Sequence, residues 1–134
     1  MTSIVNALAR ASLITLSPTV AVTADGSGTG VDITAYEGVG AVVLDAAASG
    51  TGALDQFLEE SDDNSTYTDI PATRLIKADG SSGAFTQITS SASAQLRLLA
   101  LNECKKWLRV RNDVTGSTSI TRSVSVLAQK KYQV

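Results

Sequence analysis

Residues 53–66 read ALDQFLEESDDNST, and this stretch predicts a β-strand that ends in a polar turn. Side chains alternate between the two faces of a strand, so Leu54 and Leu58 fall on one face and Asp55 and Glu59 on the other. The Asp, Asn, Ser and Thr side chains that follow can hydrogen-bond their own backbone, which favours a turn. The stretch therefore predicts a sheet with one buried face.

The same alternation recurs along the chain, separated by clusters rich in Gly, Asp and Ser. Strands are expected at residues 19–23, 39–46, 53–60, 95–99, 107–112 and 119–128, with turns at residues 25–30, 49–52, 62–66, 79–83 and 114–117. Many short strands at this spacing are typical of antiparallel sandwiches and barrels. We expect an all-β antiparallel β-sandwich, jelly-roll or Ig-like, as one domain over residues 18–134.

The inward positions of these strands define a predicted core. It comprises Val20, Val22, Val42, Leu44, Leu54, Leu58, Leu96, Leu98, Leu108, Val110, Val124 and Val126. Residues 96–106 also contain good helix formers, but we favour a strand that ends in a turn at residues 102–105.

Residues 1–17 precede the first expected strand, and we expect an extended or partly helical N-terminal arm there. Its apolar residues Ile4, Val5, Leu8 and Leu13 are candidates for contact with a neighbouring subunit. The alternative is that the arm packs on its own sandwich and covers an edge strand.

Composition excludes several classes of function. The 134 residues include no His and a single Cys, so no His-dependent triad, imidazole metal ligand or internal disulfide is available. The sequence contains no run of about 18 apolar residues, so no membrane span is expected. We expect no enzymatic activity, no bound cofactor and no metal.

Three local patterns invite a chemical interpretation, and each has a structural alternative that we favour. The Gly-rich residues 26–30 lack the spacing and the following helix of a phosphate-binding loop. Asp62, Asp63 and Asn64 offer oxygen ligands for Ca²⁺, but the spacing of a helical calcium loop is absent, so a polar turn is favoured. Asp55 and Glu59 have no apolar pocket to make them an acid–base pair.

Charge is distributed unevenly along the chain. Residues 25–69 contain ten acidic residues and no basic residue, whereas residues 97–134 contain eight basic residues and two acidic ones. The simpler interpretation is that the two parts pair as neighbouring strands whose charges face each other. The alternative is a dipolar molecule whose acidic face meets a basic face on a neighbour.

The basic residues 105–111 interleave with Trp107, a pattern seen in nucleic-acid-binding strands. The acidic part of the chain would repel a polyanion, so a solvated or protein-facing strand is favoured and no nucleic acid is expected. Phe57 shares a face with acidic residues, which suggests a partner contact or a cover for a neighbouring loop. The candidate interface here comprises Phe57, Glu59, Asp62, Lys105, Lys106 and Arg109.

Longer motifs give the chain a family resemblance. Residues 54–70 (LDQFLEESDDNSTYTDI) resemble the hairpin L-D-x-x-L-x-E-S-D-D-G-S-T-[FWY]-T-D-I of small virion proteins of tailed bacteriophages. NAL at residues 6–8, GTGVDITAYEG at 28–38, VVLDA at 42–46 and KWLRV at 106–110 resemble the other motifs of these proteins. Asn64 stands where the family more often has Gly, and Asn tolerates the same left-handed turn.

Proteins of this kind resemble head decoration, or cement, proteins. The resemblance implies a β-sandwich that sits on the major capsid protein at the capsid exterior, often as a homotrimer. It implies a structural role, and the alternatives are an adhesion or carbohydrate-binding module and a tail or connector component.

Overall fold

The computed structural model describes residues 10–47, 51–89 and 92–131. These residues form eight strands and two 3₁₀ turns. In chain order they are β1 (Ala11–Val22), β2 (Gly26–Ser27), β3 (Val31–Asp32), β4 (Tyr36–Ala46), β5 (Thr51–Ser61), β6 (Thr68–Asp69), η1 (Ala72–Arg74), β7 (Ser93–Ala100), η2 (Leu101–Glu103) and β8 (Trp107–Lys130). The predicted all-β class is confirmed. No helix in the described part of the chain is long and apolar enough to cross a membrane.

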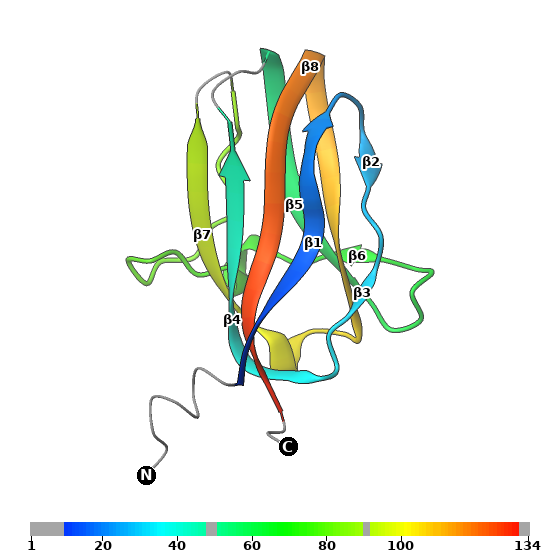
Figure 1. Ribbon diagram of the computed structural model, residues 1–134, viewed down its shortest axis with the longest axis vertical. Helices are drawn as coiled ribbons and strands as arrows, with labels where there is room; N and C mark the ends of the chain where they lie inside the picture. Colours follow the sequence, from blue (N-terminus) through cyan, green and yellow to red (C-terminus); the bar gives the residue numbers. More distant parts are fainter. Residues whose placement is uncertain (1–9, 48–50, 90–91, 132–134) are drawn as a thin grey trace.

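The strands form one antiparallel sheet that is organised around β8. Its strand order is β6-β5-β8-β4-β7, and β1, β2 and β3 also pair with β8. The first part of β8 pairs with β5, whereas the second part lies between β1 and β4. Figure 1 shows the sheet curled so that these two parts lie in different layers. The architecture is an antiparallel, curled half-barrel, and the β-sandwich of jelly-roll or Ig-like type stays a prediction.

A bend in β8 replaces one of the expected turns. Residues 114–117 were expected to separate two strands, but β8 runs through them as 24 continuous residues. Gly116 adopts a φ of 73°, a left-handed conformation that glycine accepts without steric cost. The bend therefore lets one strand pass from one layer of the curled sheet to the other, as Figure 1 shows at the top of β8.

The core fills the inside of the curl. Nine of the twelve predicted core residues are buried there, namely Val22, Val42, Leu44, Leu54, Leu58, Leu108, Val110, Val124 and Val126. They alternate with half-buried or exposed positions along their strands, as one buried face requires.

The prediction of which β7 residues face the core is wrong. Leu96 is exposed and Leu98 is half-buried, whereas Arg97 and Leu99 are buried. The guanidinium of Arg97 lies 5.3 Å from the centroid of the Phe85 ring and donates hydrogen bonds to the carbonyls of Gly83 (2.9 Å) and Ala84 (2.8 Å). The loop that contains Gly83 and Ala84 therefore needs a hydrogen-bond donor for its carbonyls on the inner side of β7. Arg97 supplies this donor, so the inner positions of β7 are not those that the alternation of leucines predicted.

The expected arm over residues 1–17 is wrong in its second half. Residues 11–17 belong to β1, which pairs with β8 in the register Leu13↔Leu127 and Ile14↔Val126. Ile14 and Leu16 are buried on the inner side of the sheet, where Ile14 lies beside Val126. The register of β1 is irregular between Thr15 and Val20, and Val20 beyond this irregularity is exposed. Ile4, Val5 and Leu8 lie outside the described residues.

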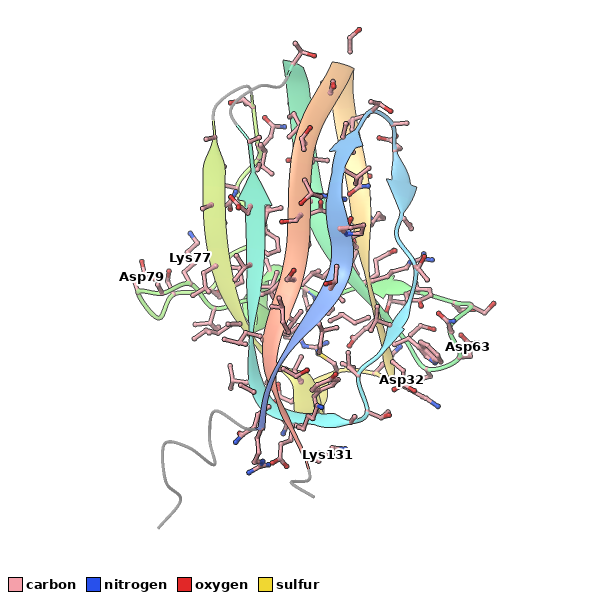
Figure 2. The ribbon with its side chains drawn as sticks, viewed as in Figure 1. Asp32, Asp63, Lys77, Asp79 and Lys131 are labelled. Atoms are coloured by element: carbon pink, nitrogen blue, oxygen red, sulfur yellow. The ribbon has the colours of Figure 1, made fainter. Side chains whose placement is uncertain are left out.

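Aspartate side chains hold three of the loops, as the turn chemistry predicts. The carboxylates of Asp32, Asp63 and Asp79 accept hydrogen bonds from the backbone amide two residues further on, each at 2.9 Å. Figure 2 shows Asp63 and Asp79 on loops at opposite sides of the molecule in that view. The expected turn over residues 25–30 differs, because Gly26 and Ser27 form β2 and Asp25 accepts from the distant amide of Val114 at 2.7 Å.

Candidate protein-interaction site

The acidic and basic parts of the chain meet on the outer side of β5 and the first part of β8. We call this surface the charged face, and it comprises Asp55, Phe57, Glu59, Arg109, Arg111 and Asp113. Glu59 lies directly opposite Arg109 in the register, and Arg109 Nε donates to Glu59 Oε1 at 2.8 Å. Glu59 is only 7% exposed. The interpretation that opposite charges face each other across neighbouring strands is confirmed for Glu59 and Arg109, whereas Asp55 lies opposite another acid, Asp113.

Arg111 connects the same face to β6. Its Nε and Nη2 donate to the two carboxylate oxygens of Asp69 at 3.2 and 3.0 Å, and its Nη1 donates to Asp113 at 2.6 Å. These hydrogen bonds raise the pKa of the guanidinium, with Asp113 contributing most and Asp69 next. The arginine is consequently held by two acids of its own chain.

The two arginines of the charged face also cover aromatic rings, Phe57 on that face and Tyr67 in the loop beside it. The guanidinium of Arg109 lies 3.7 Å from the centroid of Tyr67, and that of Arg111 lies 4.2 Å from the centroid of Phe57. Cations prefer this position over a ring because the ring face carries partial negative charge. Phe57 therefore has an intramolecular partner, and the same arginines bind acids at their edges.

The remaining charged candidates lie around a hollow at the end of the molecule where β4 begins. This hollow of about 240 Å³ is lined in part by Asp62, Lys105, Lys106 and Lys131. Lys105 Nζ lies 4.0 Å from Asp62, and Lys106 Nζ lies 3.8 Å from Asp32. Exposed pairs of this kind contribute about 0–1 kcal/mol, so these lysines can exchange partners at little cost. Figure 2 shows Lys131 and Asp32 at this same end.

The Asp62–Asp63–Asn64 sequence forms a turn that uses its own oxygen atoms. Asp63 Oδ1 accepts from the amides of Thr66 and Ser65 and from the hydroxyl of Ser61, each at 2.9 Å. These donors, the amide of Thr66 first, lower the pKa of Asp63. Asn64 takes the expected left-handed conformation with a φ of 58°. Within the described residues, no group of three or more acidic or Cys side chains could hold a metal ion.

A second carboxylate, Glu60, fixes the loops beside the hollow. Arg74 Nη1 donates to Glu60 Oε2 at 2.7 Å, and the amide of Lys105 donates to Glu60 Oε1 at 3.1 Å. Arg74 Nη2 also reaches the sulfur of Cys104 at 3.2 Å. Burial nevertheless raises the pKa of the Cys104 thiol to about 11, so the thiol stays protonated near neutral pH.

Of the candidate interface residues, the structure brings Phe57, Glu59 and Arg109 together on the charged face and Asp62, Lys105 and Lys106 around the hollow. Leu13 is separate, on the outer side of β1. Sequence reasoning missed Arg111, although its alternation with Val110 placed it on the same side as Arg109. It also missed Leu127, Val39 and Val43, which are exposed on the same side of the sheet as Leu13. Ser123, Ser125 and Leu127 alternate with buried residues, and this pattern was the available signal for Leu127.

Comparisons with known proteins add a likeness of fold. No protein-family model matches the sequence, and no curated protein matches it. Among solved structures, the chain is similar to the crystal structure of the SPBc2 prophage-derived protein YomS. The two share 15% sequence identity with a TM-score of 0.55, over 87% of this chain and 92% of that one. The likeness therefore extends over nearly the whole of both chains and is one of fold.

Proposed function

We propose that this chain is a structural protein of a bacteriophage particle that binds the outside of the capsid and stabilises the shell. The observation that carries the proposal is the fold shared with a prophage-derived protein over 87% of the chain. The motifs that resemble small virion proteins, above all residues 54–70, support a position on the outside of the capsid. The partner is then the major capsid protein, and the chain acts as a homo-oligomer.

The side-chain chemistry supports a binding role over a catalytic one. The carboxylates that could serve as general acids or bases are engaged as structural partners, Glu59 with Arg109 and Glu60 with Arg74. The arginines of the charged face are likewise bound to acids, which supports a protein partner over a polyanionic nucleic acid. We therefore propose a chain with no enzymatic activity, no cofactor and no membrane association.

Stabilisation of a shell follows from binding linkage. A protein that binds the assembled lattice and not its free subunits shifts the equilibrium toward the lattice by mass action. The exposed lysines at the hollow, Lys105 and Lys106, are suited to steer the encounter with an acidic surface on the capsid.

The test is reconstitution on particles assembled without this chain. Purified chain is added, and bound chain is separated from free chain by sedimentation of the particles. We expect saturable binding and a higher temperature of capsid disruption. Absence of binding to the capsid, or binding confined to isolated tails, would contradict the proposal and favour a tail component.

A further inference from the structure

The outer side of the other layer of the sheet is apolar. Five of the six large hydrophobic side chains exposed in the described residues lie there, and they are Leu13, Val39, Val43, Leu96 and Leu127. Leu13, Val39 and Leu127 are 66%, 60% and 50% exposed. With Ala41, Leu98 and Ala100, which complete the same side of β4 and β7, they form a surface that we call the apolar face.

The register places these side chains next to one another. Leu13 pairs with Leu127, Leu127 with Ala41, and Ala41 with Leu98, so one row crosses β1, β8, β4 and β7. Val43 and Leu96 pair in the row two residues further along. Neighbouring strands lie about 4.8 Å apart, so the row is about 14 Å wide between its outer strands. The face is therefore continuous.

No charged side chain lies among the apolar residues of the four strands, although Arg74 and Glu103 line the hollow beside β7. Charged side chains on this side of β4 occur at Glu37, where the strand begins, and at Asp45, where it ends. Glu37 is already bound to Arg10. An uncharged apolar surface can be apposed to a copy of itself without like-charge repulsion, whereas the charged face would place like charges together.

The face has a ridge at one margin and a hollow at the other. The ridge is formed by Leu13 and Leu127, its most exposed side chains on β1 and β8. The hollow, of about 290 Å³, lies along β7 and is lined by Val39, Ile76, Leu98 and Ala100, with Thr73, Arg74 and Glu103 as its polar wall. A cavity of about 150 Å³ can hold benzene, so this hollow is large enough for a leucine side chain.

We propose that the apolar face binds a second copy of this chain as a two-fold symmetric pair. The axis runs along the strands between β8 and β4, with the small side chain of Ala41 near the centre. Rotation about that axis places the ridge of each copy over the hollow of the other. Each contact is thereby made twice, as an isologous interface requires.

The apolar face is large enough for the centre of a dimer interface, and the surrounding polar residues would have to supply the rest. With side chains included it measures about 20 by 20 Å, or roughly 400 Å² per copy. A standard interface buries about 800 Å² per partner and has an apolar centre within a polar rim. Thr15 and Ser125, which pair with each other on this side, are suited to that rim. The apolar face therefore supplies the centre of a standard interface.

The experiment is sedimentation velocity of the purified full chain over a concentration series. We expect a species of twice the 13.9 kDa chain mass. Leu127→Glu should weaken association by about 100-fold or more, because it buries a charge without a partner. Val20→Glu is the matched control, because Val20 is also exposed on β1 but does not belong to the apolar face, and it should leave the dimer unchanged. Leu13→Ser gives a milder second variant, and circular dichroism checks that each variant is folded.

Three results would overturn the proposal. The first is a wild-type chain that stays monomeric at several hundred micromolar, and the second is a dimer that persists in folded Leu127→Glu and Leu13→Ser. The third is a trimer, since a two-fold pair cannot produce it. A chain that lacks residues 1–9 should dimerise as the full chain does. If only the shortened chain dimerises, residues 1–9 cover the face and the second copy does not.

Discussion

Arg122 Nε donates a hydrogen bond of 2.6 Å to Gln56 Oε1 inside the curled sheet. Arg122 is 2% exposed, and its other partners are the neutral oxygens of Ser17 (2.6 Å) and Asn112 (2.7 Å). Burial lowers the pKa of the guanidinium, and no carboxylate of the described residues pairs with it. One side chain of the second part of β8 thus connects β1, β5 and the first part of β8.

Removing an acceptor from this cluster should be costly. Gln56→Leu leaves a buried guanidinium with one partner fewer, and we expect a loss of about 3 kcal/mol in the free energy of unfolding. Gln87→Leu, which removes an exposed amide that donates to Asp55, should change stability by less than about 0.5 kcal/mol. Urea denaturation of the two variants measures the difference.

The double variant Gln56→Leu/Arg122→Met tests whether the cost comes from the buried charge. Because methionine carries no charge and packs as a flexible apolar chain, the double variant should be more stable than the sum of the two single changes predicts. Strict additivity in this cycle would mean that the two side chains do not interact.

The ion pairs of the charged face should differ in strength according to burial. Arg109→Leu leaves Glu59 mostly buried without its nearest cation and uncovers Tyr67, so we expect a loss of about 1–2 kcal/mol. Lys106→Leu removes an exposed pair at 3.8 Å from Asp32 and should cost less than about 0.5 kcal/mol. Equal losses in thermal denaturation at 0.15 M salt would contradict the internal role of the Glu59–Arg109 pair.

The carboxyl of Asp63 should titrate below its ordinary range. Its principal donors are the backbone amides of Thr66 and Ser65, so Ser61→Ala should leave most of the shift in place. A lowered folded pKa means that the stabilisation is complete above the unfolded value and is lost as pH falls through the folded value. Carbon-detected NMR titration of the side-chain carboxyls measures this, and a midpoint at or above the ordinary value for aspartate would refute it.

The thiol of Cys104 should react slowly while the protein is folded. Because burial raises its pKa to about 11, only a small fraction is thiolate at pH 7.5, and we expect alkylation by iodoacetamide to accelerate strongly in urea. Arg74→Met removes the cation beside the sulfur and should slow the reaction further. Rapid labelling of the folded chain would show that the thiol is more accessible than this environment implies.

The alternation of apolar and polar side chains predicted most of the fold. In residues 42–44 and 124–126, every second residue is apolar and buried, so the sequence shows directly which side of the strand faces the core. It failed at β7, where Arg97 takes the inner position to satisfy the carbonyls of a loop that lies more than ten residues away in sequence. It also failed at β1, since pairing along β8 and not local pattern decides where that strand begins.

The candidate site was predicted in outline only. The opposition of acidic and basic segments indicated that they would pair, but assignment of Glu59 to Arg109 and of Glu60 to Arg74 requires the strand register and the path of the loops. The apolar face needed the register of four strands, because Leu13, Val39 and Leu127 are far apart in sequence.

The proposed location of the chain on the capsid is tested most directly by its copy number in purified phage particles. Quantitative mass spectrometry with isotope-labelled peptides gives the ratio of this chain to the major capsid protein. A capsid-binding structural protein should be present in hundreds of copies per particle, at a fixed ratio to the major capsid protein. A few copies per particle, or none, would contradict the claim.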